Sequence, residues 1–195
     1  MNVSAHRRTL LPALCAVLLA GGGTAFAAQG DGSGGSGSDG KRPAAAAAAP
    51  REAAALTGTA KLYRSRGDDI TFSFDAHLAA KHRKSPHKAT GTFTFRHYLN
   101  GKGATARAEV DCLVTGGKVA VVSGVITKTD LPGARGKRVG VTVHDLGGKD
   151  RLGYSWATAP ITAKGTIPRC VSSAPFEKVL AGSGGFRVLP WQPKL

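Results

Sequence analysis

The sequence predicts an all-β fold, an antiparallel meander of about eight short strands that forms a barrel or a sandwich. From Leu56 onward, apolar and polar residues alternate with the period of two that is typical of half-buried strands. Glycine-containing pairs fall between successive runs, where hairpin turns need a positive φ. No segment of this region has the apolar stripe of an amphipathic helix.

The first three predicted strands each have one core face. They span residues 70–76, 90–99 and 104–114. The predicted core-facing residues occupy every second position and are Ile70, Phe72, Phe74 and Ala76; Phe93, Phe95, His97 and Leu99; and Ala104, Ala106, Ala108, Val110, Cys112 and Val114. We therefore expect His97 to be shielded from solvent.

Three further runs continue the meander. Residues 119–126 are apolar on both faces, which predicts a central or doubly covered strand. Residues 139–143 and 152–157 alternate again, and the second of these runs places Tyr154 and Trp156 on its apolar face. The expected turns between strands are Asn100-Gly101, Gly116-Gly117 and Gly147-Gly148. Residues 175–181 are the one segment that could form one or two helical turns.

Residues 1–27 have the organisation of a signal peptide, with Arg7 and Arg8 before an apolar run from Leu10 to Ala20 and small residues ending at Ala27. We expect cleavage after Ala27 and favour Sec export over the twin-arginine route. The apolar run is shorter than the roughly 20 residues that cross a bilayer. The mature chain is therefore expected to have no transmembrane segment and to be secreted or held at the cell surface.

Residues 28–55 are predicted to be a flexible linker of glycine, serine, alanine and proline. Its hydrophobic residues are no larger than alanine, so it cannot bury enough apolar surface to offset the entropy lost on ordering. It is expected to tether a single β domain, residues 56–195.

Cys112 and Cys170 are the only cysteines that remain after the predicted cleavage. Their wide separation does not match the paired spacings of zinc or redox sites. Export favours a structural disulfide between them, with a free or intermolecular thiol as the alternative.

The domain is strongly basic. From Leu56 onward it has 22 lysines and arginines against nine acidic residues. This excess favours attraction to a polyanion, such as wall polymer, anionic lipid or extracellular nucleic acid, through nonspecific charge. The alternative is a solvated basic surface. The residues proposed to bind an anion are Lys81, Arg83, Lys84, Lys88, Arg135, Lys137 and Arg138.

No acidic site is predicted. Glu109 and Asp111 continue a row with Arg107 on the outward face of one strand, which predicts a surface charge ladder. Asp145 and Asp150 frame a glycine turn whose spacing matches no calcium loop, so it is interpreted as a hairpin turn.

No catalytic residue, metal site or cofactor is predicted. Residues 153–157 are close to the nucleophile-elbow pattern around Ser155, but they lie in an alternating strand and no histidine follows His144. The histidines at 77, 82 and 87 lie among lysines and arginines that would repel a divalent cation.

Five segments resemble small exported actinobacterial proteins, some of which are labelled repetin. They are TGTAKLYRSRGDDITFSFDA (57–76), VDCLVTGGKVAVVSGVI (110–126), RLGYSWA (151–157), APFEKV (174–179) and VLPWQP (188–193). The resemblance implies an exported protein and no particular activity.

Three hypotheses follow for the function. The leading one is an exported, non-catalytic binding or surface-associated module with affinity for anionic partners. The second is a small-ligand-binding barrel in which His97, Tyr154 and Trp156 line a pocket. The third is an enzyme of unrecognised type. The packing of the barrel interior discriminates between them.

Overall fold

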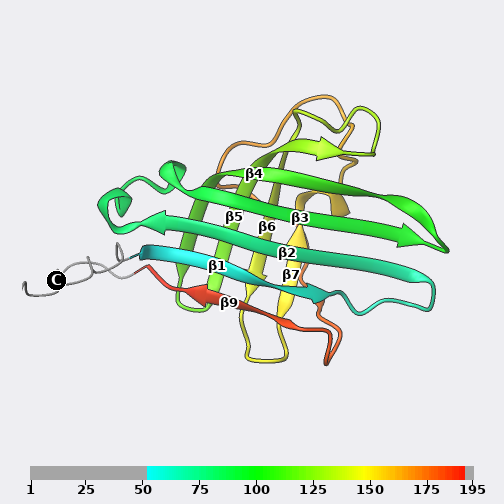
Figure 1. Ribbon diagram of the computed structural model, residues 1–195, viewed down its shortest axis with the longest axis horizontal. Coiled ribbons are helices and arrows are strands. Elements are labelled where there is room, and N and C mark those ends of the chain that lie inside the picture. The colour runs from blue at the N-terminus through cyan, green and yellow to red at the C-terminus, as the bar shows by residue number, and fades with distance from the viewer. Residues whose placement is uncertain (1–51, 192–195) are drawn as a thin grey trace, which may run out of the picture. The chain divides into compact units, whose positions relative to one another are not determined.

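A computed structural model describes residues 52–191, which form one sheet of nine antiparallel strands (Figure 1). The predicted signal peptide, residues 1–27, and all but the last residues of the linker predicted at 28–55 lie outside the described residues. The strands are β1 (Glu52–Lys61), β2 (Asp68–Ala79), β3 (Thr90–Leu99), β4 (Lys102–Gly116), β5 (Val119–Thr129), β6 (Arg138–His144), β7 (Arg151–Tyr154), β8 (Glu177–Lys178) and β9 (Gly185–Leu189). Three 3-10 helices are η1 (Ala80–His82), η2 (Pro86–Lys88) and η3 (Ser155–Ala157).

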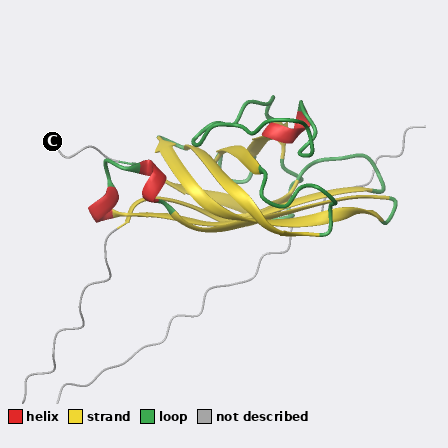
Figure 2. Cartoon of the chain, turned by 90° about the horizontal axis from the view of Figure 1, so that it is seen from above, coloured by secondary structure: helices red, strands yellow, loops and turns green. Residues whose placement is uncertain are grey.

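The predicted all-β antiparallel meander is confirmed. Strands β1 to β8 pair in chain order, and β9 returns to pair with β1. In Figure 1, β1 to β4 run across the view while β5 to β7 lie behind them and run steeply, so the sheet curls over on itself. Figure 2 shows the same curl from above, with two short helices at one end of the strands and the third among the loops over the sheet.

Aromatic side chains fill the space inside the curl. Phe72 is fully buried at the centre, where its ring lies 6.1 Å from those of Phe74 and Phe95 and 5.5 Å from that of Tyr154. Phe186 of β9 meets Phe74 edge to face at 5.4 Å. Ring contacts of this kind add stability beyond the burial of area alone. The interior is therefore a packed core.

The turns fall at or next to the positions that the sequence predicts. Asn100 and Gly101 connect β3 to β4 with φ values of 49° and 78°, the two successive positive values of a tight hairpin turn. The turn between β4 and β5 is Gly117-Lys118, one residue later than predicted, because Gly116 ends β4 and pairs with Val119. Gly147-Gly148 lies within the connection from β6 to β7.

A β-bulge in β4 changes which side chains reach the core. Val110 pairs with Gly124 while Cys112 pairs with Ser123, so Asp111 is the extra residue of the bulge. Beyond the bulge the alternation is reversed: Leu113 is fully buried and Val114 is 43% exposed. The prediction that Val114 faces the core is wrong for this reason.

The prediction that His97 is shielded is also wrong. Its side chain is 53% exposed, and Leu99 is exposed as well. Both residues keep the period of β3, but this end of the strand extends beyond the aromatic core, which stops at Phe95. The alternation of β3 therefore continues beyond the end of the core, where His97 and Leu99 are not buried.

Three element boundaries differ from the predictions. β1 begins at Glu52, and the side chains of residues 53–55 are buried, so the last four residues of the predicted linker belong to the sheet. Alanine fits there because β1 lies between β2 and β9. β7 ends at Tyr154, and residues 155–157 form η3. Residues 175–181 are extended around β8 and form no helix, because they pair with β7 and with the end of β1.

The long connection from η3 to β8, residues 158–176, crosses the outer face of the sheet, and we call it the strap. Small residues let its backbone lie close: a Cβ at Gly140 would collide with the Val171 carbonyl oxygen. The strap is fastened by the predicted disulfide between Cys112 and Cys170, which is confirmed, and by the Cys170 N–H, which donates to Ser123 Oγ at 3.0 Å. The strap thus meets the outer face of β5 at Ser123, which is fully buried.

Two aspartates close the curled sheet. Asp150, 2% exposed, accepts the Phe186 N–H at 2.7 Å, and Asp145 accepts the Val188 N–H at 3.1 Å. These N–H groups belong to the outer edge of β9, so the carboxylates of the turn between β6 and β7 take the place of a neighbouring strand. At the other end of β1, Leu62 pairs with Val179 after β8. The turn interpretation of residues 145–150 thus holds, with an additional role for its carboxylates.

We expect Asp150→Ala to lower the free energy of unfolding by about 3 kcal/mol. The substitution leaves the Leu146 and Phe186 N–H groups without their acceptor, and hydrogen bonds to a charged acceptor are worth about 1.5–3 kcal/mol each. Urea unfolding followed by circular dichroism measures the change. Glu109→Ala, which removes an exposed carboxylate, is the control and should change stability by less than about 0.5 kcal/mol. Equal effects of the two substitutions would contradict the closure.

Candidate functional site: two basic regions and the hollows beside them

The carboxylates of the domain are used in its own structure. Those that bind a basic side chain are Glu52, Asp68, Asp69, Asp75, Asp111, Asp145 and Glu177. Asp130 and Asp150 accept backbone N–H groups. Of the acidic residues between 52 and 191, only Glu109 has neither kind of partner. Few carboxylates are left to neutralise the exposed lysines.

The first basic region is the connection between β2 and β3, residues 80–88, which we call the basic turn. It contains η1 and η2, and both short helices place basic residues in their last turn. Lys81, Lys84 and Lys88 are exposed, and none of them forms an ion pair with a carboxylate of the described residues. Arg83 is half-buried, and its carbonyl oxygen accepts the Trp191 indole N–H at 3.0 Å.

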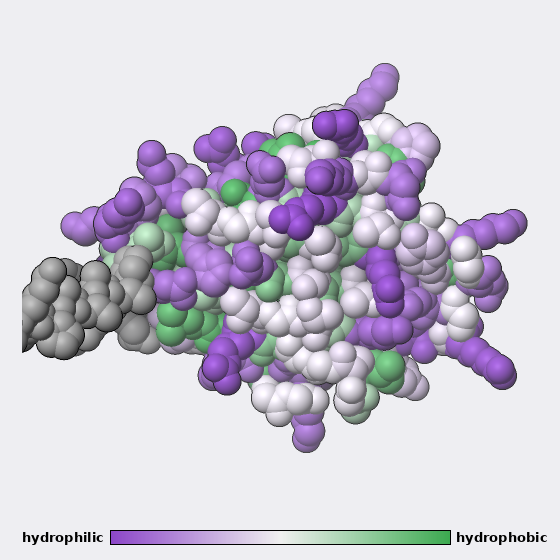
Figure 3. All heavy atoms as spheres, viewed as in Figure 1, coloured by the Kyte–Doolittle hydropathy of each residue, from purple (hydrophilic) through white to green (hydrophobic). Residues whose placement is uncertain are grey.

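Apolar side chains lie next to the basic turn. Leu78, Leu113, Val114 and Trp191 line a hollow of about 290 Å³ together with Arg83 and Lys84. Val114 and Trp191 are themselves exposed. Figure 3 shows hydrophilic side chains projecting around this face of the molecule, with smaller hydrophobic areas between them. The basic turn therefore combines positive charge with exposed apolar surface.

The second predicted anion-binding group, Arg135, Lys137 and Arg138, lies at the opposite end of the strands. Connections alternate between the two ends of an antiparallel meander, and these residues connect β5 to β6 whereas the basic turn connects β2 to β3. The structure therefore does not bring the seven proposed anion-binding residues together. Arg135 is exposed, while Lys137 and Arg138 are half-buried against the strap.

Arg138 holds the strap in place. Its Nε lies 2.6 Å from Asp111 Oδ2, and its Nη1 donates to the Ile167 carbonyl oxygen at 3.3 Å. Asp111 also accepts the Ser123 hydroxyl at 2.6 Å and lies 3.7 Å from Arg169. The bulge turns Asp111 into this position, so it does not continue the surface charge ladder predicted with Glu109.

The three predicted pocket residues have different surroundings. His97 and Trp156 both line a hollow of about 370 Å³ at the end of the curl, together with Phe95, Leu131 and Pro132. The His97 Nε2 lies 2.9 Å from Asp68 Oδ1.

Tyr154 is buried beneath Trp156, and the centroids of their rings are 5.0 Å apart. Burial raises the pKa of the Tyr154 hydroxyl, which accepts a hydrogen bond from Arg64 at 3.1 Å. Tyr154 therefore belongs to the core.

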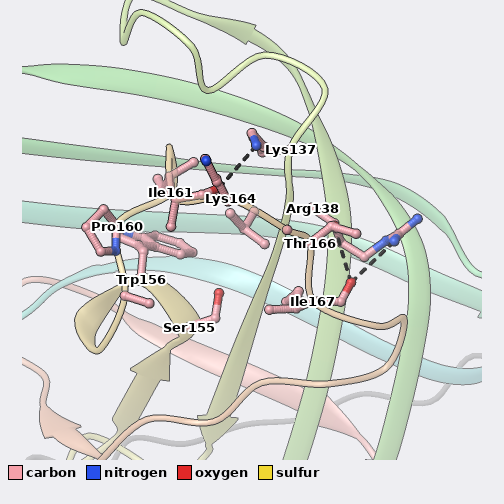
Figure 4. A pocket seen from close by; sticks show the side chains of 13 residues that line it. Lys137, Arg138, Ser155, Trp156, Pro160, Ile161, Lys164, Thr166 and Ile167 are labelled. Carbon is pink, nitrogen blue, oxygen red and sulfur yellow. Dashed lines mark hydrogen bonds between the residues drawn. The ribbon is translucent and has the colours of Figure 1, made fainter.

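A further hollow, of about 250 Å³, lies under the strap (Figure 4), and we call it the strap hollow. Trp156 and Ile161 line it as well as the larger hollow, so the indole borders both spaces. Lys137 and Lys164 lie at its upper side in Figure 4, and the Ser155 hydroxyl points up into it. The sequence does not indicate that Lys164 and Ser155 line a site with Trp156, because only the path of the strap brings Lys164 to this place.

Ser155 lies in a 3-10 helix and not in the strand that the sequence predicts. The residue begins η3, and its Oγ accepts the Gly140 N–H at 3.1 Å. Within residues 52–191, no group of three or more potential ligands gathers in a way that could hold a metal ion. Of the helices in this part of the chain, none has the length and apolarity that a membrane crossing needs.

His77 lies between two carboxylates where β1 begins. Its Nδ1 is 2.5 Å from Glu52 and its Nε2 is 2.7 Å from Asp75. Partial burial opposes protonation of the ring, but the hydrogen bonds to Asp75 and Glu52 outweigh it and raise the pKa of His77 above its ordinary value of 6.5. Both ring nitrogens donate only in the protonated form. The arrangement therefore fixes the start of β1 to β2 while His77 is charged.

No protein family, no curated protein and no solved structure matches this chain. The candidate site is therefore defined by the chemistry of the residues described above.

The pKa of His77 predicts how stability depends on pH. A group whose pKa is raised in the folded state contributes stability that is complete below pH 6.5 and is lost as the pH rises through the folded pKa. We expect the free energy of unfolding of the unmodified domain to exceed that of His77→Gln by about 0.5 kcal/mol at pH 5.5, since the site is partly exposed. Thermal unfolding between pH 5.5 and 9 measures this difference. A difference that stays constant over this range would contradict a charged His77.

Proposed function

We propose that this protein is an exported, non-catalytic β-domain that associates with anionic partners through its basic turn. The observation that carries the proposal is the contrast between the acids and the lysines. All but one of the described carboxylates are occupied within the fold, while Lys81, Lys84 and Lys88 project from one turn without such a partner. Attraction to a polyanion is the chemistry that this distribution favours.

The position of the basic turn fits this role. Glu52, the first described residue, pairs with Ala79 immediately before the basic turn. The predicted linker therefore leads into the domain at the end that carries the exposed lysines. A tether at this end would hold the basic turn toward whatever the linker is attached to.

The test compares retention on heparin, on wall polymer and on vesicles of anionic lipid over a salt series. Salt screens attraction beyond roughly 10 Å at 0.1 M, so the charges closest to a bound polyanion dominate retention. We therefore expect Lys81→Ser, Lys84→Ser and Lys88→Ser together to lower the salt concentration needed for elution by about half. The control combines Lys102→Ser, Lys128→Ser and Lys178→Ser, which removes the same charge from exposed positions elsewhere.

The control variant should lose much less retention than the basic-turn variant. Equal losses would show that the lysines of the basic turn act only as part of a diffuse positive field. Absence of retention for the unmodified domain on all three supports at low salt would overturn the proposal.

A further inference from the structure

The strap hollow exists because the strap is fastened at two separate points. On one side, Asp111 and Arg138 hold the strap at Ile167, and the disulfide follows at Cys170. On the other side, Lys137 Nζ donates to the Ala163 carbonyl oxygen at 3.2 Å. Between these points the strap passes over Val139, Ser155 and Trp156 without filling the space above them. Dashed lines in Figure 4 mark the hydrogen bonds from Lys137 to Ala163 and from Arg138 to Ile167.

The upper side of the strap hollow is positively charged. Lys137 uses one of its three ammonium donors on Ala163 and keeps the others. Lys164 is exposed and makes no ion pair with a described carboxylate. Asp111, the β4 carboxylate that fastens the strap, is already bound by Arg138 and Arg169. An anion that enters the hollow would therefore meet two ammonium groups whose charge is not neutralised.

The base of the hollow offers a hydrogen-bond donor and apolar walls. Ser155 Oγ accepts the Gly140 N–H, and its own O–H donates to no acceptor among the described residues. Figure 4 shows this hydroxyl between the Trp156 indole and the Ile167 side chain. Ile161 adds a second aliphatic wall beside the indole. These groups suit a flat apolar body carrying a single anionic group.

We propose that the strap hollow binds a small organic anion, one ring with a carboxylate or a phosphate group. The apolar ring packs against Trp156 and Ile161, and the anionic group lies between Lys137, Lys164 and the Ser155 hydroxyl. The volume of about 250 Å³ is below the 300–1,000 Å³ of pockets for drug-sized ligands, which limits the body to a single ring. This site is independent of the basic turn, which lies at the opposite end of the strands.

The experiment uses the fluorescence of Trp156. Trp191 is the only other tryptophan, so Trp191→Phe leaves Trp156 as the sole emitter. Benzoate, phenyl phosphate, inorganic phosphate and benzyl alcohol are titrated separately into this variant. We expect a saturable change of emission with benzoate or phenyl phosphate. Benzyl alcohol, which has the ring without the charge, and inorganic phosphate, which has the charge without the ring, should bind at least about tenfold more weakly.

Substitutions then locate the site. Lys137→Gln with Lys164→Gln should raise the dissociation constant of the better probe by about tenfold. Lys149→Gln with Lys178→Gln removes the same charge from exposed positions that line none of the hollows, and should change it less than about twofold. Lys164→Gln alone leaves the Lys137 fastening intact, and an increase of about threefold would show that the charge acts directly on the anion.

Three results would overturn the proposal. The first is that the emission of Trp156 does not change with any probe up to millimolar concentrations. The second is that benzyl alcohol binds as tightly as benzoate. The third is that the two double substitutions change the dissociation constant equally. None of these results depends on retention by heparin, wall polymer or vesicles, so this site and the basic turn are tested separately.

Discussion

The hydrogen bonds from β9 to two aspartate carboxylates are the interaction on which the rest of this structure depends. A curled sheet with two free edges would expose unpaired N–H groups and open the aromatic core to water. Asp150 and Asp145 bind the Phe186 and Val188 N–H groups and remove that edge. Burial opposes the charge of Asp145, but the N–H groups of Val188 and Gly147 and the ammonium of Lys118 lower the pKa of Asp145 below its ordinary value. The lowered pKa keeps the Asp145 carboxylate ionised at neutral pH, where it accepts the Val188 N–H.

The same use of acids shapes the surface. Carboxylates close the sheet at Asp150, fasten the strap at Asp111 and pair with His77 at Glu52 and Asp75. The basic residues outnumber them, so most exposed lysines have no acidic partner within the described residues. The meander then distributes these lysines over two ends, one with the basic turn and one with the strap hollow. The excess of basic over acidic residues thus accounts for both features. The acids are used within the fold, and the exposed lysines that have no acidic partner give the surface its attraction for anions.

The sequence predicts the local features of the fold and misses those created by long-range packing. Alternation and glycine pairs are local, and they predict most strands and the hairpin turns. The bulge at Asp111 is not visible in the alternation, so the pattern predicts Val114 in the core where the structure has Leu113. His97 shows the limit of periodicity, because a strand can continue beyond its core. The candidate sites were predicted only as residue types: Trp156, Lys137 and the lysines of the basic turn carry recognisable chemistry, but the path of the strap decides which of them meet.

Amide hydrogen exchange of residues on β9, followed by NMR at neutral pH, tests the central claim most directly. If carboxylates close the sheet, the Phe186 and Val188 N–H groups should have protection factors within about tenfold of that of Val122 at the centre of β5. Their exchange then requires the opening of the closed sheet. Exchange of both amides at the rate of an unprotected chain, while Val122 stays protected, would show that β9 is an open edge and would contradict the account.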